Sequence, residues 1–95
     1  MFEVPKSKRS LKANRFPFKI GTKSHDVPLL KFAPVEATLL WEQGRDTAGL
    51  LACCDKPEVE AALRTLDSDQ LDALSDAWIA ASRVSPGESE SSDDS

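Results

Sequence analysis

The sequence predicts a mainly α protein in which a short N-terminal β-hairpin precedes a small three-to-four-helix domain. Two patterns predict this fold class. Apolar residues alternate at period 2 near residue 16, and they recur at spacings of three and four from residue 35 onward. The two ends, residues 1–15 and 84–95, are mostly polar and charged and are predicted to be disordered tails. We therefore expect a single small domain over residues 16–83.

The charge of the chain changes sign along its length. Residues 1–31 carry eight Lys and Arg against two carboxylates, and residues 32–95 carry four against fourteen. The chain is therefore a basic flexible arm, an acidic helical body and an acidic tail. The cations of the arm, residues 1–15, suit phosphate contact, but no aromatic platform or base-reading helix accompanies them. This favours a solvated arm over a nucleic-acid partner.

Cysteine usage and hydropathy limit the class of protein further. The two cysteines, Cys53 and Cys54, are adjacent, and the single histidine, His25, is far away in the sequence. This argues against a disulfide and against a zinc-type ligand spacing. The longest apolar run, Leu50 to Cys54, is too short to span a membrane. We expect a soluble intracellular protein with buried, structural thiols.

The hairpin is predicted over residues 16–30. Apolar residues alternate from 16 to 20, a turn cluster follows at 21–24, and a second extended stretch comes after it. Pro17 and Pro28 each lack an amide donor, so both strands are expected to be edge-like or to pair only in part. Because two strands alone are marginal in water, the hairpin should lean on the helices or on another subunit.

The first two helices are predicted over about 34–43 and 48–54. Pro34 suits a first helical turn, and Gly44 is placed to close the helix in left-handed geometry. Residues 45–49 are then a connector. One face of the first helix is expected to comprise Val35, Thr38, Leu39 and Glu42, and Leu40 and Trp41 are expected to widen its apolar side.

The last two helices are predicted over about 56–66 and 68–82. Asp55 is expected to cap the first of them, and Asp67 with Gln70 forms a capping box for the second. The very short connection predicts a helical hairpin or an L-shaped pair that shares one core. The apolar stripes that should meet there comprise Val59, Ala62, Leu63 and Leu66 on one helix and Leu71, Leu74, Trp78 and Ala81 on the other.

No catalytic motif stands out. The sequence has no Gly-rich phosphate loop and no second histidine to serve a nucleophile. Asp69, Asp72 and Asp76, together with Ser75, fall off the apolar stripe of the last helix and are interpreted as a solvated face. We expect a non-enzymatic interaction protein with no cofactor and no metal.

Several short features occur in a fixed order from about Arg15 to the end of the chain. They are Phe16-x-Phe18-x-Ile20, Val27-Pro28-Leu29-Leu30, a helix ending near Leu39-Leu40-Trp41 and Gly44, the stretch from Leu66-Asp67-x-x-Gln70-Leu71 to Trp78, and Gly87-Glu88-Ser89 before a serine-rich end. In their order and spacing the chain resembles the tail assembly chaperones of long-tailed (siphovirus-type) actinobacterial phages or prophages.

The resemblance implies a morphogenesis factor of the host cytoplasm that is absent from the finished virion. Such chaperones coat and solubilise the tape-measure protein and promote tail-tube assembly around it, so the implied partners are the tape-measure protein and the tail-tube protein. Many are made in two lengths by a programmed ribosomal frameshift. The codons for Gly87-Glu88-Ser89 are a candidate slippage point.

The residues also suggest where a partner would bind. An acidic body with an incompletely buried Leu/Trp surface can bind reversibly over the apolar stripes of the tape-measure protein. Self-association of the chain is a further expectation. The seam between the first helix and Trp78 is the expected place. The predicted partner-binding residues are Phe32, Leu39, Leu40, Trp41, Leu63, Leu66, Leu71, Leu74 and Trp78. Two alternatives remain open: a small nucleic-acid-associated protein that uses the basic arm, and a structural tail component retained in the virion.

Overall fold

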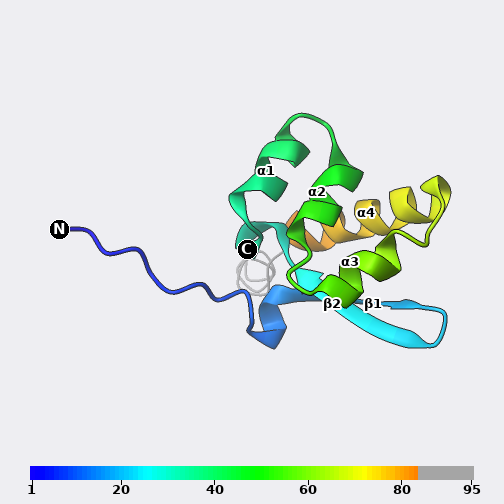
Figure 1. Cartoon of the computed structure of the whole chain (residues 1–95). Coiled ribbons are helices and arrows are strands. Elements are labelled where there is room, and N and C mark those ends of the chain that lie inside the picture. Colours follow the sequence, from blue (N-terminus) through cyan, green and yellow to red (C-terminus); the bar gives the residue numbers. More distant parts are fainter. Residues whose placement is uncertain (84–95) are drawn as a thin grey trace, which may run out of the picture.

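The computed structural model describes residues 1–83, and the predicted acidic tail, residues 84–95, lies outside the described residues (Figure 1). The fold is mainly α with an N-terminal antiparallel hairpin, as predicted. The elements in chain order are η1 (Lys12–Asn14), β1 (Arg15–Ile20), β2 (Lys23–Pro28), η2 (Leu30–Phe32), α1 (Val35–Glu42), α2 (Asp46–Cys53), α3 (Pro57–Leu63) and α4 (Ser68–Arg83), where η1 and η2 are single 3₁₀ turns.

The hairpin is tighter than predicted. Its turn is only Gly21-Thr22, and Gly21 adopts a φ of 63°, which a glycine tolerates without steric cost. The register pairs Phe16 with Val27 and Phe18 with His25, so residues 23 and 24 belong to β2 rather than to the turn. The aromatic side chains of β1 pack against the helical core. The hairpin therefore packs against the helices, as expected.

The predicted boundary of the basic arm at residue 15 is wrong. Arg15 opens β1, and η1 precedes it. The backbone N–H of Leu29 donates to the carbonyl of Asn14 at 3.0 Å, and the side-chain amide of Asn14 donates to the carbonyl of Lys8 at 2.9 Å. Residues 9–15 are therefore fastened to the body. Figure 1 shows the first residues of the chain running away from it.

α1 and α2 form a close pair above the rest of the molecule (Figure 1). Gly44 ends the first helix with a φ of 77°, which confirms its predicted left-handed geometry. The predicted connector 45–49 is wrong, because α2 begins at Asp46 and Gly49 is buried inside it. A Cβ atom on Gly49 would lie 3.0 Å from the carbonyl oxygen of Ala37. The absent side chain lets the two helices approach closely.

The buried face of α1 also differs from the prediction. Ala37 is fully buried, whereas Val35 is 73% exposed and Leu39 is 50% exposed. The packing against Gly49 explains this rotation, since only a small residue on α1 fits against the small residue on α2. Val35 and Leu39 consequently lie on the outer side of the helix.

α4 begins as predicted, with a complete capping box. The N–H of Gln70 donates to the carboxylate of Asp67 at 2.8 Å, and the N–H of Asp67 donates to the side-chain oxygen of Gln70 at 2.9 Å. Asp69, Asp72 and Asp76 are exposed, as expected, but Ser75 is buried and its hydroxyl donates to the carbonyl of Asp72 at 3.0 Å. Ser75 thus belongs to the buried face, because this internal hydrogen bond satisfies its hydroxyl.

α3 is shorter than predicted and is not capped by Asp55. Its N-cap is Lys56, and no side chain of residues 1–83 caps it. The helix ends at Leu63 rather than at 66, where the hydroxyl of Thr65 donates to the carbonyl of Ala62 at 2.6 Å and competes with the helical ladder. The carboxylate of Asp55 is bound by Arg15 instead.

Trp78 of α4 lies at the centre of the core. Its side chain is fully buried, and its indole N–H donates to the carbonyl of Pro28 at 2.9 Å, which ties α4 to β2. α4 packs mainly on α2, with the hairpin on its other side. The core residues are Val27, Ala37, Leu50, Cys53, Val59, Leu63, Trp78 and Ile79. The predicted stripes of α3 and α4 do share this core.

Candidate functional site

The described part of the chain holds no metal-ligand cluster. No group of three or more His, Cys, Asp or Glu side chains converges within residues 1–83. Cys53 is buried, its thiol donates to the carbonyl of Leu50 at 3.0 Å, and the neighbouring Cys54 thiol together with burial raises the pKa of Cys53. A thiol held protonated in this way is structural. None of the helices up to Arg83 is long and apolar enough to cross a membrane.

Arg15 is the centre of a charge cluster whose two carboxylates, Asp26 and Asp55, remain partly exposed. Its side chain is only 8% exposed, and its two terminal nitrogens donate to both carboxylate oxygens of Asp55, at 2.9 and 3.0 Å. Its Nε donates to Asp26 at 3.1 Å. The hydrogen bond to Asp55 raises the pKa of Arg15, and the same bond holds the pKa of Asp55 below its ordinary value. With every charge paired, this cluster holds the fold together rather than performing chemistry.

A wide hollow lies between the hairpin and α3, with a volume of about 790 Å³. Basic side chains of Lys23 and Lys56 line it together with the carboxylates of Asp26 and Glu58. Lys56 also pairs with Asp26 at 3.3 Å. The mixture of signs and the open shape favour a solvated surface.

A second hollow, which we call the Trp41 groove, is smaller and has an apolar floor. Its volume is about 450 Å³, and it is built from η2, α1 and α4. The N–H of Leu30 donates to the hydroxyl of Ser82 at 2.9 Å, and this bond holds η2 against α4. The groove is lined by Leu30, Lys31, Thr38, Trp41, Ile79, Ser82 and Arg83. The partly exposed side chain of Trp41 therefore lines a hollow whose lining also includes two cations, Lys31 and Arg83.

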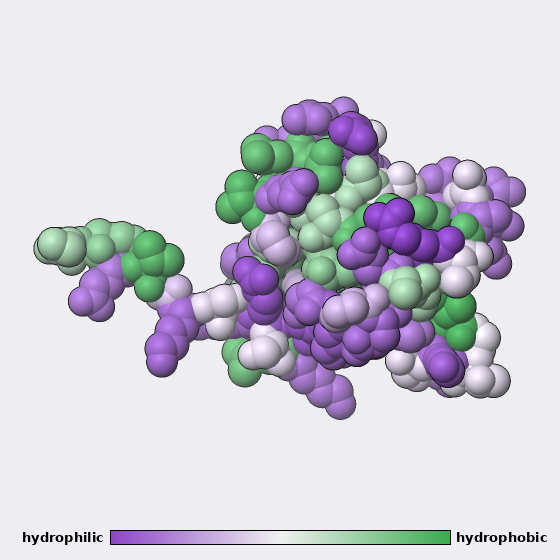
Figure 2. Space-filling view, viewed as in Figure 1, coloured by the Kyte–Doolittle hydropathy of each residue, from purple (hydrophilic) through white to green (hydrophobic). Residues whose placement is uncertain are grey.

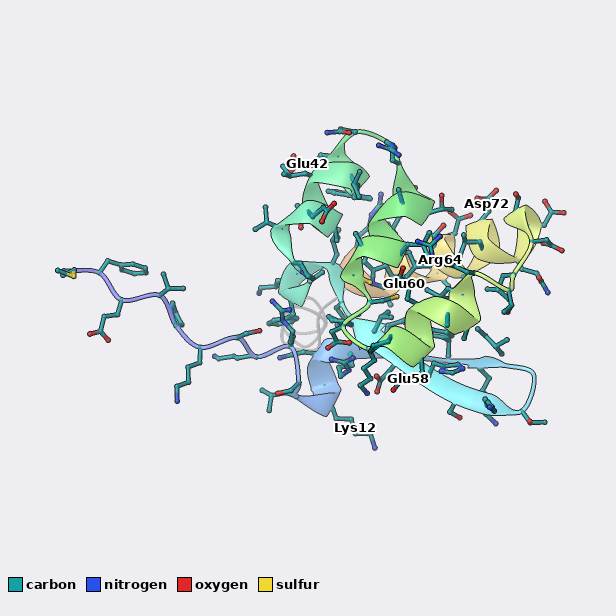
Figure 3. The ribbon with its side chains drawn as sticks, viewed as in Figure 1. Lys12, Glu42, Glu58, Glu60, Arg64 and Asp72 are labelled. Atoms are coloured by element: carbon teal, nitrogen blue, oxygen red, sulfur yellow. The ribbon has the colours of Figure 1, made fainter. Side chains whose placement is uncertain are left out.

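The outer face of α1 is a separate apolar surface. It consists of Val35 and Leu39, one helical turn apart, with the exposed carboxylates of Glu36 and Glu42 beside them. Figure 2 shows apolar surface over α1, and Figure 3 shows Glu42 at the far end of that helix. Thr38, three residues after Val35, lines the edge of the Trp41 groove, so this face borders the groove along one side of α1.

The nine predicted partner-binding residues do not form one seam. Leu63 and Trp78 are fully buried, so both serve the core alone and cannot contact a partner. Leu66 and Leu74 line a different hollow, next to Gly21 of the hairpin turn. Trp41 lines the groove, and Leu39 lies on the outer face of α1. The remaining members, Phe32, Leu40 and Leu71, are partly buried.

Sequence reasoning missed the groove residues that α4 and η2 contribute. Ile79 and Leu30 supply apolar floor beside Trp41, whereas the prediction placed Trp78 there. The available signal was the position of Ile79, which follows Leu71 by eight residues and Ser75 by four and so completes a helical stripe. Because the middle residue of that stripe is Ser75, the stripe does not stand out as apolar in the sequence.

No known protein family, curated protein or solved structure matches this chain.

Proposed function

We propose that the protein is a phage tail assembly chaperone, which binds and solubilises the tape-measure protein and promotes tail-tube assembly without enzymatic chemistry in the host cytoplasm. The observation that carries this proposal is the Trp41 groove, an apolar hollow of about 450 Å³ with cationic side chains in its lining. A hollow of this kind suits a few side chains of an amphipathic helix. A tape measure offers such helices before the tube encloses them.

The chemistry of the groove supports reversible binding. Trp41 supplies a rigid aromatic surface, and such surfaces dominate binding energy in small interfaces. Lys31 and Arg83 at the edge can pair with carboxylates that flank the apolar stripe of the bound helix. The exposed carboxylates of α4, at Asp69, Asp72 and Asp76, keep the resulting complex hydrated. Tight irreversible binding would prevent the tube from displacing the chaperone.

Co-expression with the tape-measure protein of the same genome tests the proposal. Thr38→Glu places a carboxylate in the groove, where it competes with the tape measure for Lys31 and Arg83, and Ala77→Glu adds the same charge at an exposed site on α4. We expect the unsubstituted chain and the Ala77→Glu control to keep the tape measure in the soluble fraction, and Thr38→Glu to let it pellet. A tape measure that stays soluble with Thr38→Glu, or pellets with the unsubstituted chain, contradicts the proposal.

Tryptophan fluorescence gives a direct measure of groove occupancy. Trp41 is partly exposed and Trp78 is fully buried, so acrylamide quenches mainly the first of them. A bound helical segment of the tape measure should shield Trp41 and reduce quenching. The Trp41→Phe variant should show no such change, because the signal of Trp78 is already protected. Unaltered quenching in the unsubstituted protein at saturating peptide would exclude the groove as the binding site.

The gene itself offers an independent test. A tail-tube gene upstream and a very long tape-measure gene downstream are expected next to a tail assembly chaperone. We also propose a programmed frameshift at the codons for Gly87-Glu88-Ser89, which lie outside the described residues. The absence of a homopolymeric run at these codons, or of an overlapping downstream frame, would remove the frameshift from the proposal without affecting the groove.

A further inference from the structure

The first eight residues carry apolar side chains at one end and cations at the other. Met1, Phe2 and Val4 have exposed fractions of 119%, 82% and 85%, and Lys6 and Lys8 follow them. Residues 5–9 lie against residues 31–33 of the same chain, where they line a shallow hollow. This contact fixes the base of the arm, and the apolar tip extends away from the body (Figure 1). The tip is therefore presented to other molecules.

The outer face of α1 carries the complementary pattern. Val35 and Leu39 are exposed one turn apart, and the carboxylates of Glu36 and Glu42 lie beside them. Exposed apolar pairs of this kind are commonly covered by a partner. A segment that covered this face would need apolar side chains for the centre and cations for the edge. Residues 1–8 supply both, with two cations against the single carboxylate of Glu3.

We propose that residues 1–8 of one copy dock on the outer face of α1 of a second copy. Phe2 and Val4 then cover Val35 and Leu39, and Lys6 and Lys8 pair with Glu36 and Glu42. Charge complementarity identifies this occupant, since the chain combines a basic first third with an acidic remainder. The inference goes beyond the proposed function and does not depend on it.

The geometry of this contact determines the kind of assembly. The docking segment and the receiving face are different surfaces, so each copy that gives an arm can also receive one. Repetition of the contact produces rings, of which a pair of copies that exchange arms is the smallest, or open chains. A segment of eight residues buries little area, so the association should be weak, concentration-dependent and sensitive to salt.

Sedimentation velocity over a range of protein and salt concentrations measures the association. The arm variant Phe2→Asp/Lys6→Glu/Lys8→Glu and the face variant Leu39→Asp should each weaken it by roughly tenfold or more. The control Asp69→Lys/Asp72→Lys, which changes the charge of the exposed face of α4, should leave it intact. A chain that stays monomeric at every concentration, or associates equally well in the arm and face variants, overturns the proposal.

Mixing the two defective variants distinguishes arm docking from every symmetric interface. The arm variant keeps a working face, and the face variant keeps a working arm, so the pair should form a one-to-one heterodimer that cannot grow further. Neither variant should associate alone. In a second check, Lys6→Glu/Lys8→Glu combined with Glu36→Lys/Glu42→Lys in one chain should restore association. Mixtures that remain monomeric, together with no rescue by the charge exchange, overturn the proposal.

Discussion

At the scale of single residues, Arg15 has the largest structural role that the sequence did not reveal. Its guanidinium joins β1, β2 and the connection between α2 and α3 through hydrogen bonds to Asp26 and Asp55. A third partner is the carbonyl of Arg9, at 2.8 Å, which anchors the base of the arm. One side chain thus holds together segments that are up to forty residues apart in the sequence.

The Arg15→Met variant should be markedly destabilised. It retains the apolar stem and removes every charged hydrogen bond of Arg15, so Asp55 loses its partner and Asp26 keeps only Lys56. We expect a loss of about 2 to 3 kcal/mol in the free energy of unfolding, measured with urea and followed by circular dichroism. The matched control is Arg64→Met, which removes an exposed pair with Glu60 on α3 (Figure 3). That change should cost less than about 0.5 kcal/mol. Equal losses in both variants would contradict the role of Arg15.

At the scale of elements, the crossing of α1 and α2 depends on the absence of a side chain at Gly49. Helix propensity alone predicts that Gly49→Ala stabilises α2 by about 1 kcal/mol. The new Cβ atom, however, would lie 3.0 Å from the carbonyl of Ala37 and 3.8 Å from the Cβ of Trp41. We expect the steric conflict with the backbone to prevail, with a lower unfolding midpoint and altered Trp41 fluorescence. A higher midpoint would show that the helices can separate at little cost.

The capping box of α4 is the second prediction at this scale. Asp67→Ala removes the acceptor that binds the N–H of Gln70, and it should cost about 1 kcal/mol in the free energy of unfolding. Hydrogen exchange should accelerate mainly in the first turn of α4. Asp72→Ala, on the exposed face of the same helix, removes a carboxylate without removing a cap and serves as the control. The cap would be unimportant if the two variants were equally stable.

The elements that sequence patterns predicted correctly are those governed by neighbouring residues. The capping box, the left-handed Gly44 and the alternating β1 each depend on contacts within about four positions. The incorrect assignments involve distant partners. Asp55 has the right residue type and position for a cap, but Arg15, forty residues away, binds its carboxylate instead. A pattern of neighbouring residues cannot show that Arg15 and the helix amides compete for the carboxylate of Asp55.

The candidate site was predicted in part for the same reason. Trp41 was expected at a partner surface and does line the groove, but Trp78 does not, because the carbonyl of Pro28 accepts its indole hydrogen bond inside the core. The two tryptophans have similar local sequence settings on apolar helical stripes. Only the packing of η2 against α1 and α4 decides which of them stays accessible.

At the scale of the whole molecule, the charge distribution connects stability with solution conditions. The body is acidic and the arm is basic, yet one arginine next to the arm is folded into the body as the partner of two carboxylates. Folding therefore stabilises the ionised form of Asp55, whose pKa lies below its ordinary value because Arg15 donates two hydrogen bonds to it. The unfolded chain binds a proton at Asp55 more readily than the folded chain does.

The consequence is a defined acid sensitivity. Above the ordinary aspartate pKa of 3.8, the contribution of the Asp55–Arg15 pair to stability is fully present. As the pH falls below that value, the unfolded state takes up the proton first, and the contribution is lost progressively until the pH passes the lower pKa of the folded state. Urea midpoints measured between about pH 6 and about pH 2 should therefore decline most steeply below about pH 4. Asp55→Asn should start from a lower midpoint and decline less steeply over the same range, because its amide does not titrate. If the two curves run parallel, proton uptake at Asp55 does not control the acid unfolding of this protein.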